Sequence, residues 1–526
     1  MISHRARIHQ WVFVSFMILT VIGMQFSHFL VSISIILMAA NFLAEGDFSR
    51  KLKFCSEHKV ILLFGSLFLL HGLGLLWSTD WDYGMHDIQI KLPLLALAVV
   101  IGASSKISRF QFELILVFFL ATSLLSSIIG SLIYFVWSQP GDDYRLMSPF
   151  MSHIRLSLMM GVAIFSAFYL GRNSHFFRGF RNVFIGLGVW FLGYLFMLRA
   201  MSGIMAVLAA IFVLLWIISS ERNIKYSTSL KGIIVAVFIL GSGYVVWQIR
   251  DFYAIEEIQE SNYYETTKSG SPYYFDVSIP LLENGKYVYS FIARDEIHSA
   301  WNEVSEIPFD SLDLKGQPLE TTLIRYLTSK GLRKDKEGVA QLTHLDIWAI
   351  ENGIANYRFL NAKSLNTMVY RYIWEVHNFM NGFNPQGNSL GQRFLFWKLG
   401  TEIFSENFWM GVGTGDVQVA YNEKYDHLPF HIQERYRLRA HNQYLTMGIT
   451  FGIFGLIFFL FTLFYGFVEK PNTMSYLFTG FFVILMVSML DEDTLETQFG
   501  VTFAAFFYFF FLFQHPPKEN LDTEEL

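Results

Sequence analysis

The chain has 526 residues, of which 53% are hydrophobic, 17% aromatic and only 16% charged, and its mean hydropathy is +0.37. Water-soluble domains carry about 25% charged residues, so this composition indicates a membrane protein. The apolar content excludes a disordered chain, and the single cysteine, Cys55, excludes a disulfide framework. A net charge of −5 gives no basis for nucleic-acid binding.

Long apolar runs predict an all-α polytopic membrane protein with about twelve transmembrane helices. A spanning helix needs about 20 largely apolar residues, and the polar break at Gln25-Phe26-Ser27-His28 divides the first run into a hairpin of two short spans. Runs without Asp, Glu, Lys or Arg lie near residues 11–44, 60–78, 92–105, 114–137, 156–171, 182–198, 200–220, 232–249, 445–468, 474–490 and 499–515.

The distribution of lysine and arginine predicts the orientation of these spans. With the amino terminus in the cytoplasm, the short outer loops carry only Lys91, Arg145, Arg155 and Arg199. Both termini are then expected in the cytoplasm. The inner segments carry Arg5, Arg7, Arg50, Lys51, Lys53, Lys59, Lys106, Arg109, Arg172, Arg178, Arg181, Arg222, Lys225, Lys231 and Lys470.

Between spans nine and ten lies a long segment of ordinary soluble composition, which is expected on the outer face. Phe275–Ile279 and Lys286–Ala293 alternate as strands do around Glu283-Asn284-Gly285, which predicts a β-hairpin. Helical spacing follows within 323–327, 342–348 and 394–404. We therefore expect a membrane domain in 1–249, a mixed α/β periplasmic domain in 250–443, membrane spans again in 444–515 and a cytoplasmic tail in 516–526.

Common signatures of soluble enzymes are missing, since the sequence has no GxxxxGK[ST], no HExxH and no CxxC. The glycine-rich segment Gly411–Asp416 is read as a turn that lets the backbone pass close to another element. Asp491-Glu492-Asp493 offers carboxylates to a hard cation, but a solvated loop is the better interpretation for at least two of these acids. No metal and no cofactor are expected.

The informative pattern is a group of basic side chains at the outer ends of spans, where the positive-inside bias should remove them. Arginine pairs with phosphate through two hydrogen bonds, and a neighbouring histidine can act as the base on an incoming hydroxyl. The pattern favours glycosyl transfer from a lipid-linked diphosphate, although headgroup contacts are the alternative for each arginine. The group comprises His153, Arg155, Arg199, Arg393, Arg437, Arg439 and His441.

Arg439-Ala440-His441-Asn442-Gln443-Tyr444-Leu445, with Gly448, Phe451-Gly452 and Gly455-Leu456, resembles the HNxYL…GxxGL signature of the O-antigen ligase and polymerase superfamily. Segments 393–397 and 407–415 also resemble this family, and 274–356 is similar to the enlarged outer domain of its Bacteroidetes-type members. The resemblance implies a GT-C-like inner-membrane enzyme. Such an enzyme moves a glycan from undecaprenyl diphosphate to a periplasmic acceptor without a metal.

The same resemblance implies roles for individual residues. His441 matches the family's essential histidine, expected to activate or orient the acceptor hydroxyl. Arg199, in Leu198-Arg199-Ala200-Met201-Ser202-Gly203, matches the arginine of the family's SRxG-like turn with a displacement of two positions. Arg393 and Arg439 are the other candidates for diphosphate binding. Supporting roles are predicted for Arg437, Asn442, Tyr444, His153, Arg155 and Asp493.

Ligation of O-antigen to a lipid A–core sugar is the first hypothesis, and a polymerase or a protein O-oligosaccharyltransferase would use the same motifs. A transporter or flippase is an alternative from another class, but repeat symmetry and mid-membrane ionisable residues are not evident. A structural scaffold would not need the outer arginines. The expected partners are an undecaprenyl-diphosphate-linked glycan, a glycan, lipid A–core or protein acceptor, and the bilayer.

Overall fold

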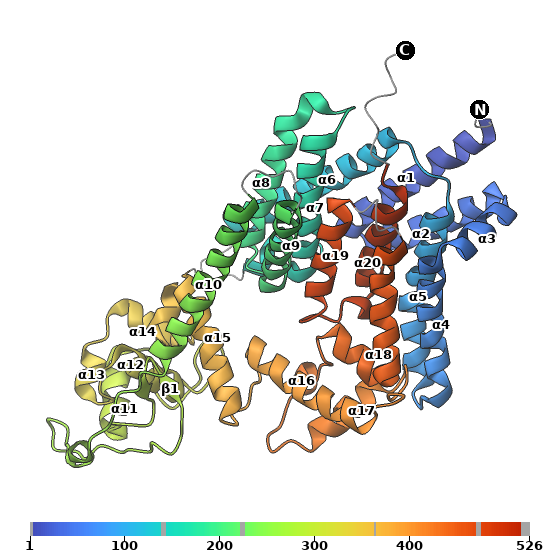
Figure 1. Cartoon of the computed structure of the whole chain (residues 1–526). Helices are drawn as coiled ribbons and strands as arrows, with labels where there is room; N and C mark the ends of the chain where they lie inside the picture. The colour runs from blue at the N-terminus through green and yellow to red at the C-terminus, as the bar shows by residue number, and fades with distance from the viewer. Residues whose placement is uncertain (1–3, 138–143, 221–226, 362–363, 470–474, 517–526) are drawn as a thin grey trace. The chain divides into compact units, whose positions relative to one another are not determined.

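The computed structural model describes residues 4–137, 144–220, 227–361, 364–469 and 475–516, which are mostly helical (Figure 1). Among the described residues, ten helices are long and apolar enough to cross a membrane, and two shorter apolar helices follow at Tyr476–Ser488 and Gln498–Gln514. These twelve helices coincide with the twelve predicted spans, so the fold class of an all-α polytopic membrane protein is confirmed. Arg222, Lys225, Lys470 and the tail beyond 516 lie outside the described residues.

The polar break predicted in the first apolar run is confirmed, because it separates α1 (His4–Phe26) from α2 (His28–Glu45). Ser27 caps α2 by accepting a hydrogen bond from the Leu30 N–H at 3.3 Å. The following helices are α3 (Phe48–Glu57), α4 (Lys59–Gly74), α5 (Trp81–Ala103), α6 (Arg109–Leu132), α7 (His153–Asn173), α8 (Arg181–Met197) and α9 (Met201–Ser220).

The second half of the chain begins with α10 (Ser227–Phe252) and the short strands β1 (Leu282–Glu283) and β2 (Lys286–Tyr287). Helices α11 to α15 are α11 (Arg294–Val304), α12 (Leu319–Lys330), α13 (Lys336–Ala340), α14 (His344–Glu351) and α15 (Leu365–Met380). The last helices are α16 (Ser389–Glu406), α17 (Val417–Asp426), α18 (Gln443–Glu469), α19 (Tyr476–Ser488) and α20 (Gln498–Phe509).

The chain divides into two compact units, one of Met1–Lys231 with Phe396–Leu526 and one of Gly232–Leu395. The second unit ends before the boundary predicted at residue 443, because α17 and the loop before α18 belong to the first unit. The topological domains 1–249, 250–443 and 444–515 remain a prediction, since they depend on where a bilayer lies.

The core of the first unit forms around α20, in which every residue from Phe499 to Phe509 is buried. A helix that is apolar on all sides belongs in the interior of a bundle, and α20 packs against α5 and α19 (Figure 1). α19 in turn packs against α7 and α9. The short loop between α19 and α20 is therefore fixed at both ends by buried helices.

The predicted β-hairpin is confirmed at its turn but is much smaller than expected. Leu282 pairs with Tyr287 and Glu283 with Lys286, and the turn residues Asn284 and Gly285 have φ values of 51° and 76°, as a two-residue hairpin turn requires. Phe275–Ile279 is not a strand. The Asp276 carboxylate accepts from the backbone N–H of Ser278 at 3.1 Å, and such local bonds compete with a ladder. Among the described residues of the predicted mixed α/β insert, the regular structure is thus helical apart from two short strands, and the rest is turns and irregular segments.

In the second unit, a buried carboxylate joins α12 to α14. Asp346 lies 2.8 Å from the Lys330 ammonium and accepts from the hydroxyls of Tyr326 at 2.5 Å and Thr343 at 2.7 Å. Burial opposes ionisation of Asp346, yet these hydrogen bonds lower its pKa to about 2. The bonds therefore stabilise the unit above the ordinary pKa, and this contribution is lost as the pH falls through 2.

We predict that Asp346→Asn lowers the free energy of unfolding of the full chain by about 2 kcal/mol at pH 7. The deficit should shrink between pH 4 and pH 2, where wild-type Asp346 becomes protonated. Thermal unfolding in detergent across this pH range measures the effect. Asp310→Asn, in the exposed contact with Arg294, is the control and should change stability by less than about 1 kcal/mol. A deficit independent of pH would contradict the account.

Candidate active site

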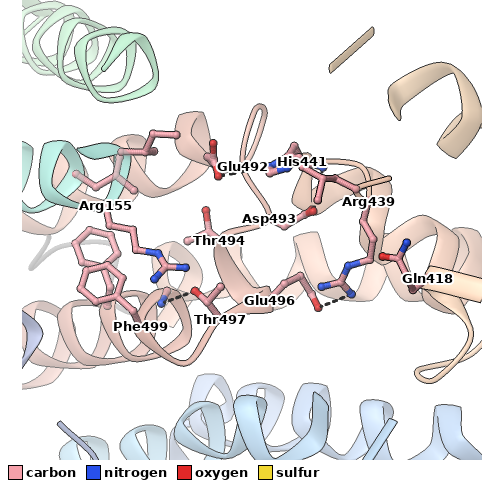
Figure 2. Close-up of a pocket in the computed structure, with 15 residues that line it drawn as sticks. Arg155, Gln418, Arg439, His441, Glu492, Asp493, Thr494, Glu496, Thr497 and Phe499 are labelled. Carbon is pink, nitrogen blue, oxygen red and sulfur yellow. Dashed lines mark hydrogen bonds and ion pairs between the residues drawn. The ribbon is translucent and has the colours of Figure 1, made fainter. Parts of the chain in front are cut away.

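A pocket of about 270 Å³ opens in the first unit where the start of α7, the loop before α18 and the loop between α19 and α20 meet (Figure 2). Both basic and acidic side chains face it, which distinguishes it from the apolar surfaces of the surrounding helices. The lining residues are Ile154, Arg155, Leu158, Gln418, Leu438, Arg439, His441, Glu492, Asp493, Thr494, Glu496, Thr497, Phe499, Gly500 and Phe503.

His441 lies in the loop directly before α18, in an unusual backbone conformation. Its φ is 46°, a left-handed value that costs energy for a residue with a side chain. The carboxylate of Asp493 holds this conformation by accepting from the His441 N–H at 3.0 Å and the Asn442 N–H at 3.1 Å. The Thr446 hydroxyl donates to the same carboxylate at 2.7 Å. Burial raises the pKa of Asp493, an effect that the Arg439 charge opposes.

Asn442 and Tyr444 hold the start of α18 in place. The Asn442 side chain accepts from the Leu445 N–H at 3.0 Å and donates to the Leu490 carbonyl at 3.0 Å. The Tyr444 hydroxyl donates to the Met486 carbonyl at 2.7 Å. These bonds tie α18 to α19, so both residues position the loop that carries His441.

The His441 ring is packed between an aromatic ring and an acid. It stacks on Phe396 with a centroid separation of 5.7 Å and an interplanar angle of 28°. Nδ1 lies 3.7 Å from Oε2 of Glu492, and Figure 2 shows the two side chains directed toward each other. About a third of the His441 side chain, 32%, stays exposed, so a substrate can reach the imidazole.

A buried chain of alternating charges ends at Arg439. Oε2 of Glu496 lies 3.4 Å from Arg439 and 2.9 Å from Lys91, and Lys91 also lies 3.0 Å from Asp87. Burial opposes ionisation of Glu496, but the charges of Lys91 and Arg439 hold its pKa well below the ordinary value. The Gln443 amide donates to the same carboxylate at 3.1 Å. The expectation that Lys91 lies in a short loop is wrong, because it is fully buried within α5.

Arg155 is a cation of the pocket that is not part of this chain of ion pairs, although the charge of Glu492 acts on it. Within the part of the chain that the structure describes, its guanidinium makes no hydrogen bond or ion pair. The Phe499 ring centroid lies 5.7 Å from the guanidinium carbon. Figure 2 shows the side chain between α7 and α20 on the pocket wall. A guanidinium without an ion pair, in the same pocket as a partly exposed histidine, is suited to an anionic ligand.

Two other predicted arginines lie outside this pocket. The Arg199 guanidinium lies 5.4 Å from the Tyr144 ring, and His153 packs edge-on against the same ring at 6.0 Å. Arg437 pairs with Asp426 at 2.7 Å and donates to the Ile432 carbonyl at 3.1 Å. Arg437 therefore fastens the loop after α17. The predicted roles of Arg199 and His153 remain predictions.

Arg393 belongs to the second unit, where its charge and that of Arg371 act on the Glu375 carboxylate. Glu375 also accepts a hydrogen bond from the Leu390 N–H at 2.7 Å, in the first turn of α16. The predicted contact of Arg393 with a diphosphate therefore stays a prediction.

The three acids 491–493 do not form a solvated loop, so that interpretation is wrong. None of them is exposed, and Asp491 accepts from the Ser202 hydroxyl at 2.5 Å. The loop is pinned to α9 through Asp491 and to the backbone before α18 through Asp493. Glu492, Glu496 and Gln418 face the pocket although no role was predicted for them. The cluster of acids in 491–496 was the sequence signal that could have identified Glu492 and Glu496. The residues that these acids contact lie far away in sequence.

The glycine-rich segment Gly411–Asp416 is a close-approach turn, as predicted. Gly411 and Gly413 have φ values of 68° and 93°, and the N–H groups of Val412 and Gly413 donate to the carbonyls of Ile449 and Thr450. A Cβ on Gly413 would lie 2.4 Å from the Ser78 hydroxyl oxygen. The turn thus locks α18 against the end of α4.

Residues 352–460 match the family model described as O-antigen ligase. This segment includes Arg393, Arg439, His441 and the glycine-rich turn, so the resemblance to the O-antigen ligase superfamily is confirmed on the residues that suggested it. Over this segment the chain is similar to the O-antigen ligase family, and its long apolar helices are those of a polytopic membrane protein. No curated protein matches the chain.

The buried carboxylate of Glu496 gives a test of the site's stability. Glu496→Gln should lower the free energy of unfolding by about 3–5 kcal/mol, because it removes the negative charge between Lys91 and Arg439. Thermal unfolding of the purified protein in detergent measures this loss. Glu406→Gln, in the exposed pair with Lys424, is the matched control and should cost less than about 1 kcal/mol. Equal, small losses in both variants would show that the buried pairs contribute little.

Proposed function

We propose that this protein is a glycosyltransferase on the periplasmic face of the bacterial inner membrane. It moves a glycan from undecaprenyl diphosphate to an acceptor hydroxyl. The observation that carries this proposal is the pocket lined by His441, Arg155 and Arg439 together, because it combines a base with cations suited to a diphosphate. The match of 352–460 to the O-antigen ligase family supports the same chemistry.

The reaction assigns one task to each side chain. His441 takes the proton of the acceptor hydroxyl, whose oxygen forms a bond to the anomeric carbon of the glycan. The bond from that carbon to the diphosphate breaks, and its electron pair stays on the departing oxygen. Arg155 offsets the growing negative charge directly, and Arg439 contributes through the network with Glu496. Arg199 and Arg393 are candidates for further contacts with the donor, and no metal is needed.

Ligation of O-antigen to a lipid A–core sugar is the acceptor reaction we propose first. The family match is compatible with polymerisation of the lipid-linked glycan and with protein O-glycosylation, since all three begin from the same donor. The match favours glycosyl transfer over a transporter or flippase. Deletion of the gene separates the acceptors: loss of long-chain lipopolysaccharide bands means ligation, single-repeat bands mean polymerisation, and unmodified glycoproteins mean the protein transferase.

We predict that His441→Asn abolishes glycan transfer, with a loss of at least about 100-fold, because general-base catalysis is removed. Asparagine is chosen because it tolerates the left-handed conformation at this position, so folding should be preserved. Complementation of the deletion strain, read as the affected glycoconjugate and as glycan accumulating on the lipid carrier, measures the effect. His427→Asn, at an exposed histidine, is the control and should complement fully. Normal complementation by His441→Asn would remove His441 from the mechanism.

Arg155→Lys should raise the KM for the donor about tenfold, because lysine cannot form the paired hydrogen bonds that guanidinium gives to phosphate. The assay uses purified protein and undecaprenyl-diphosphate-linked glycan extracted from the deletion strain. Arg172→Lys, at an exposed position near the other end of α7, should leave KM unchanged. An unchanged KM in Arg155→Lys would assign this arginine to the lipid headgroups instead.

A further inference from the structure

Glu492 occupies a place in the pocket that the proposed chemistry has not yet used. Its carboxylate lines the pocket, its side chain is 21% exposed, and Oε2 lies 3.7 Å from Nδ1 of His441. The acids on either side are anchored, Asp491 to the Ser202 hydroxyl and Asp493 to the backbone of His441 and Asn442. Glu492 is therefore carried on a short loop that is fixed on both sides.

The other charged groups around His441 are committed elsewhere. The carboxylate of Asp493 is taken up by two backbone N–H groups and the Thr446 hydroxyl, and Glu496 is held between Lys91 and Arg439. Arg439 and Arg155 contribute positive charge from the loop before α18 and from α7, and Phe396 of α16 covers one face of the ring. Oε2 of Glu492 lies 3.7 Å from Nδ1 of the imidazole, whereas Asp493 acts on His441 through its charge and through the backbone N–H.

We propose that Glu492 is the positioning residue of His441: its carboxylate holds the proton on Nδ1, so that Nε2 is the nitrogen that receives the acceptor's proton. The inference rests on the proposed glycosyl transfer and deepens it by assigning the partner of its base. A carboxylate at this place orients the ring and stabilises the imidazolium that forms during the reaction.

The proton balance of the step is complete. The acceptor's O–H proton passes to Nε2 while the oxygen bonds to the anomeric carbon, and the electron pair of the breaking carbon–oxygen bond leaves with the diphosphate. The Nδ1 proton stays on the ring, and Glu492 stays ionised throughout. A separation of 3.7 Å is long for a hydrogen bond, but catalytic contacts in ligand-free enzymes commonly shorten when substrate binds.

A second role for Glu492 makes a different prediction. Its charge also acts on Arg155, so Glu492 could serve only to balance that arginine until a diphosphate arrives. Removing the carboxylate would then strengthen donor binding and leave the behaviour of His441 unchanged. The two roles are separated by measuring His441 directly.

The primary experiment follows the reaction of His441 with diethyl pyrocarbonate, which modifies neutral imidazole. Modification of the His441 peptide is quantified by mass spectrometry over pH 5–9 in the intact protein. In Glu492→Gln the midpoint should move about one pH unit lower, because a carboxylate near the ring favours the protonated imidazole. Asp491→Asn can still accept from Ser202 and is the matched control, with an unchanged midpoint.

Kinetics with the extracted undecaprenyl-diphosphate-linked glycan give the second measurement. Glu492→Gln should reduce kcat 10- to 100-fold, shift the acid limb of the pH profile lower and leave the donor KM no higher. Glu492→Asp keeps the negative charge but places it one methylene further from the ring. This variant should bring the midpoint of His441 modification close to the wild-type value and restore part of kcat. Because it keeps the negative charge, it also serves if the glutamine variant unfolds.

An unchanged midpoint together with an unchanged kcat in folded Glu492→Gln would overturn the inference, and a lowered donor KM alone would assign Glu492 to Arg155. These outcomes are distinct from failure of the proposed function. If His441→Asn remains active, the base itself is wrong. If His441→Asn is inactive and Glu492→Gln is normal, only the role of Glu492 is wrong.

Discussion

The carboxylate of Asp493 is the contact on which the arrangement of the site depends. It accepts hydrogen bonds from the backbone N–H groups of His441 and Asn442. These bonds offset the energetic cost of the left-handed conformation that directs the histidine toward the pocket. Because the same loop carries Glu492 and Glu496, one short segment between α19 and α20 sets the position of the histidine, its acidic neighbour and the partner of Arg439. The rigid helix α20 behind this loop keeps the spacing fixed.

The chain of Asp87, Lys91, Glu496 and Arg439 explains how four charges coexist in an apolar bundle. Each lies beside an opposite charge, so the cost of burial is offset by pairing. As a result Arg439 is largely neutralised before any ligand binds, whereas Arg155 is not. Arg155 is therefore the cation of the pocket that can pair with a ligand, whereas the charge of Arg439 is already paired with Glu496.

Much of this fold follows from local sequence. The eleven apolar runs, the Ser27 break that divides the first of them into α1 and α2, and the Asn284-Gly285 turn are all properties of a few adjacent residues, so they were predictable. The strand at Phe275–Ile279 failed because Asp276 and Ser278 bond to each other instead. The interpretations of Lys91 and of the acids 491–493 were wrong because Glu496, Ser202 and the backbone of His441, their respective partners, lie far away in sequence. Motif and charge predicted roles for His441, Arg439 and Asp493. Only the three-dimensional structure shows that they line one pocket with Arg155 and Glu492.

The central claim is that this pocket binds a lipid-linked diphosphate beside His441. A structure of the full chain in a lipid nanodisc with bound undecaprenyl diphosphate tests it most directly. The account predicts the diphosphate in contact with the Arg155 guanidinium, near Arg439 and with the His441 ring facing its terminal phosphate. Density for the diphosphate elsewhere, with the pocket between α7 and the loop before α18 empty, would contradict it.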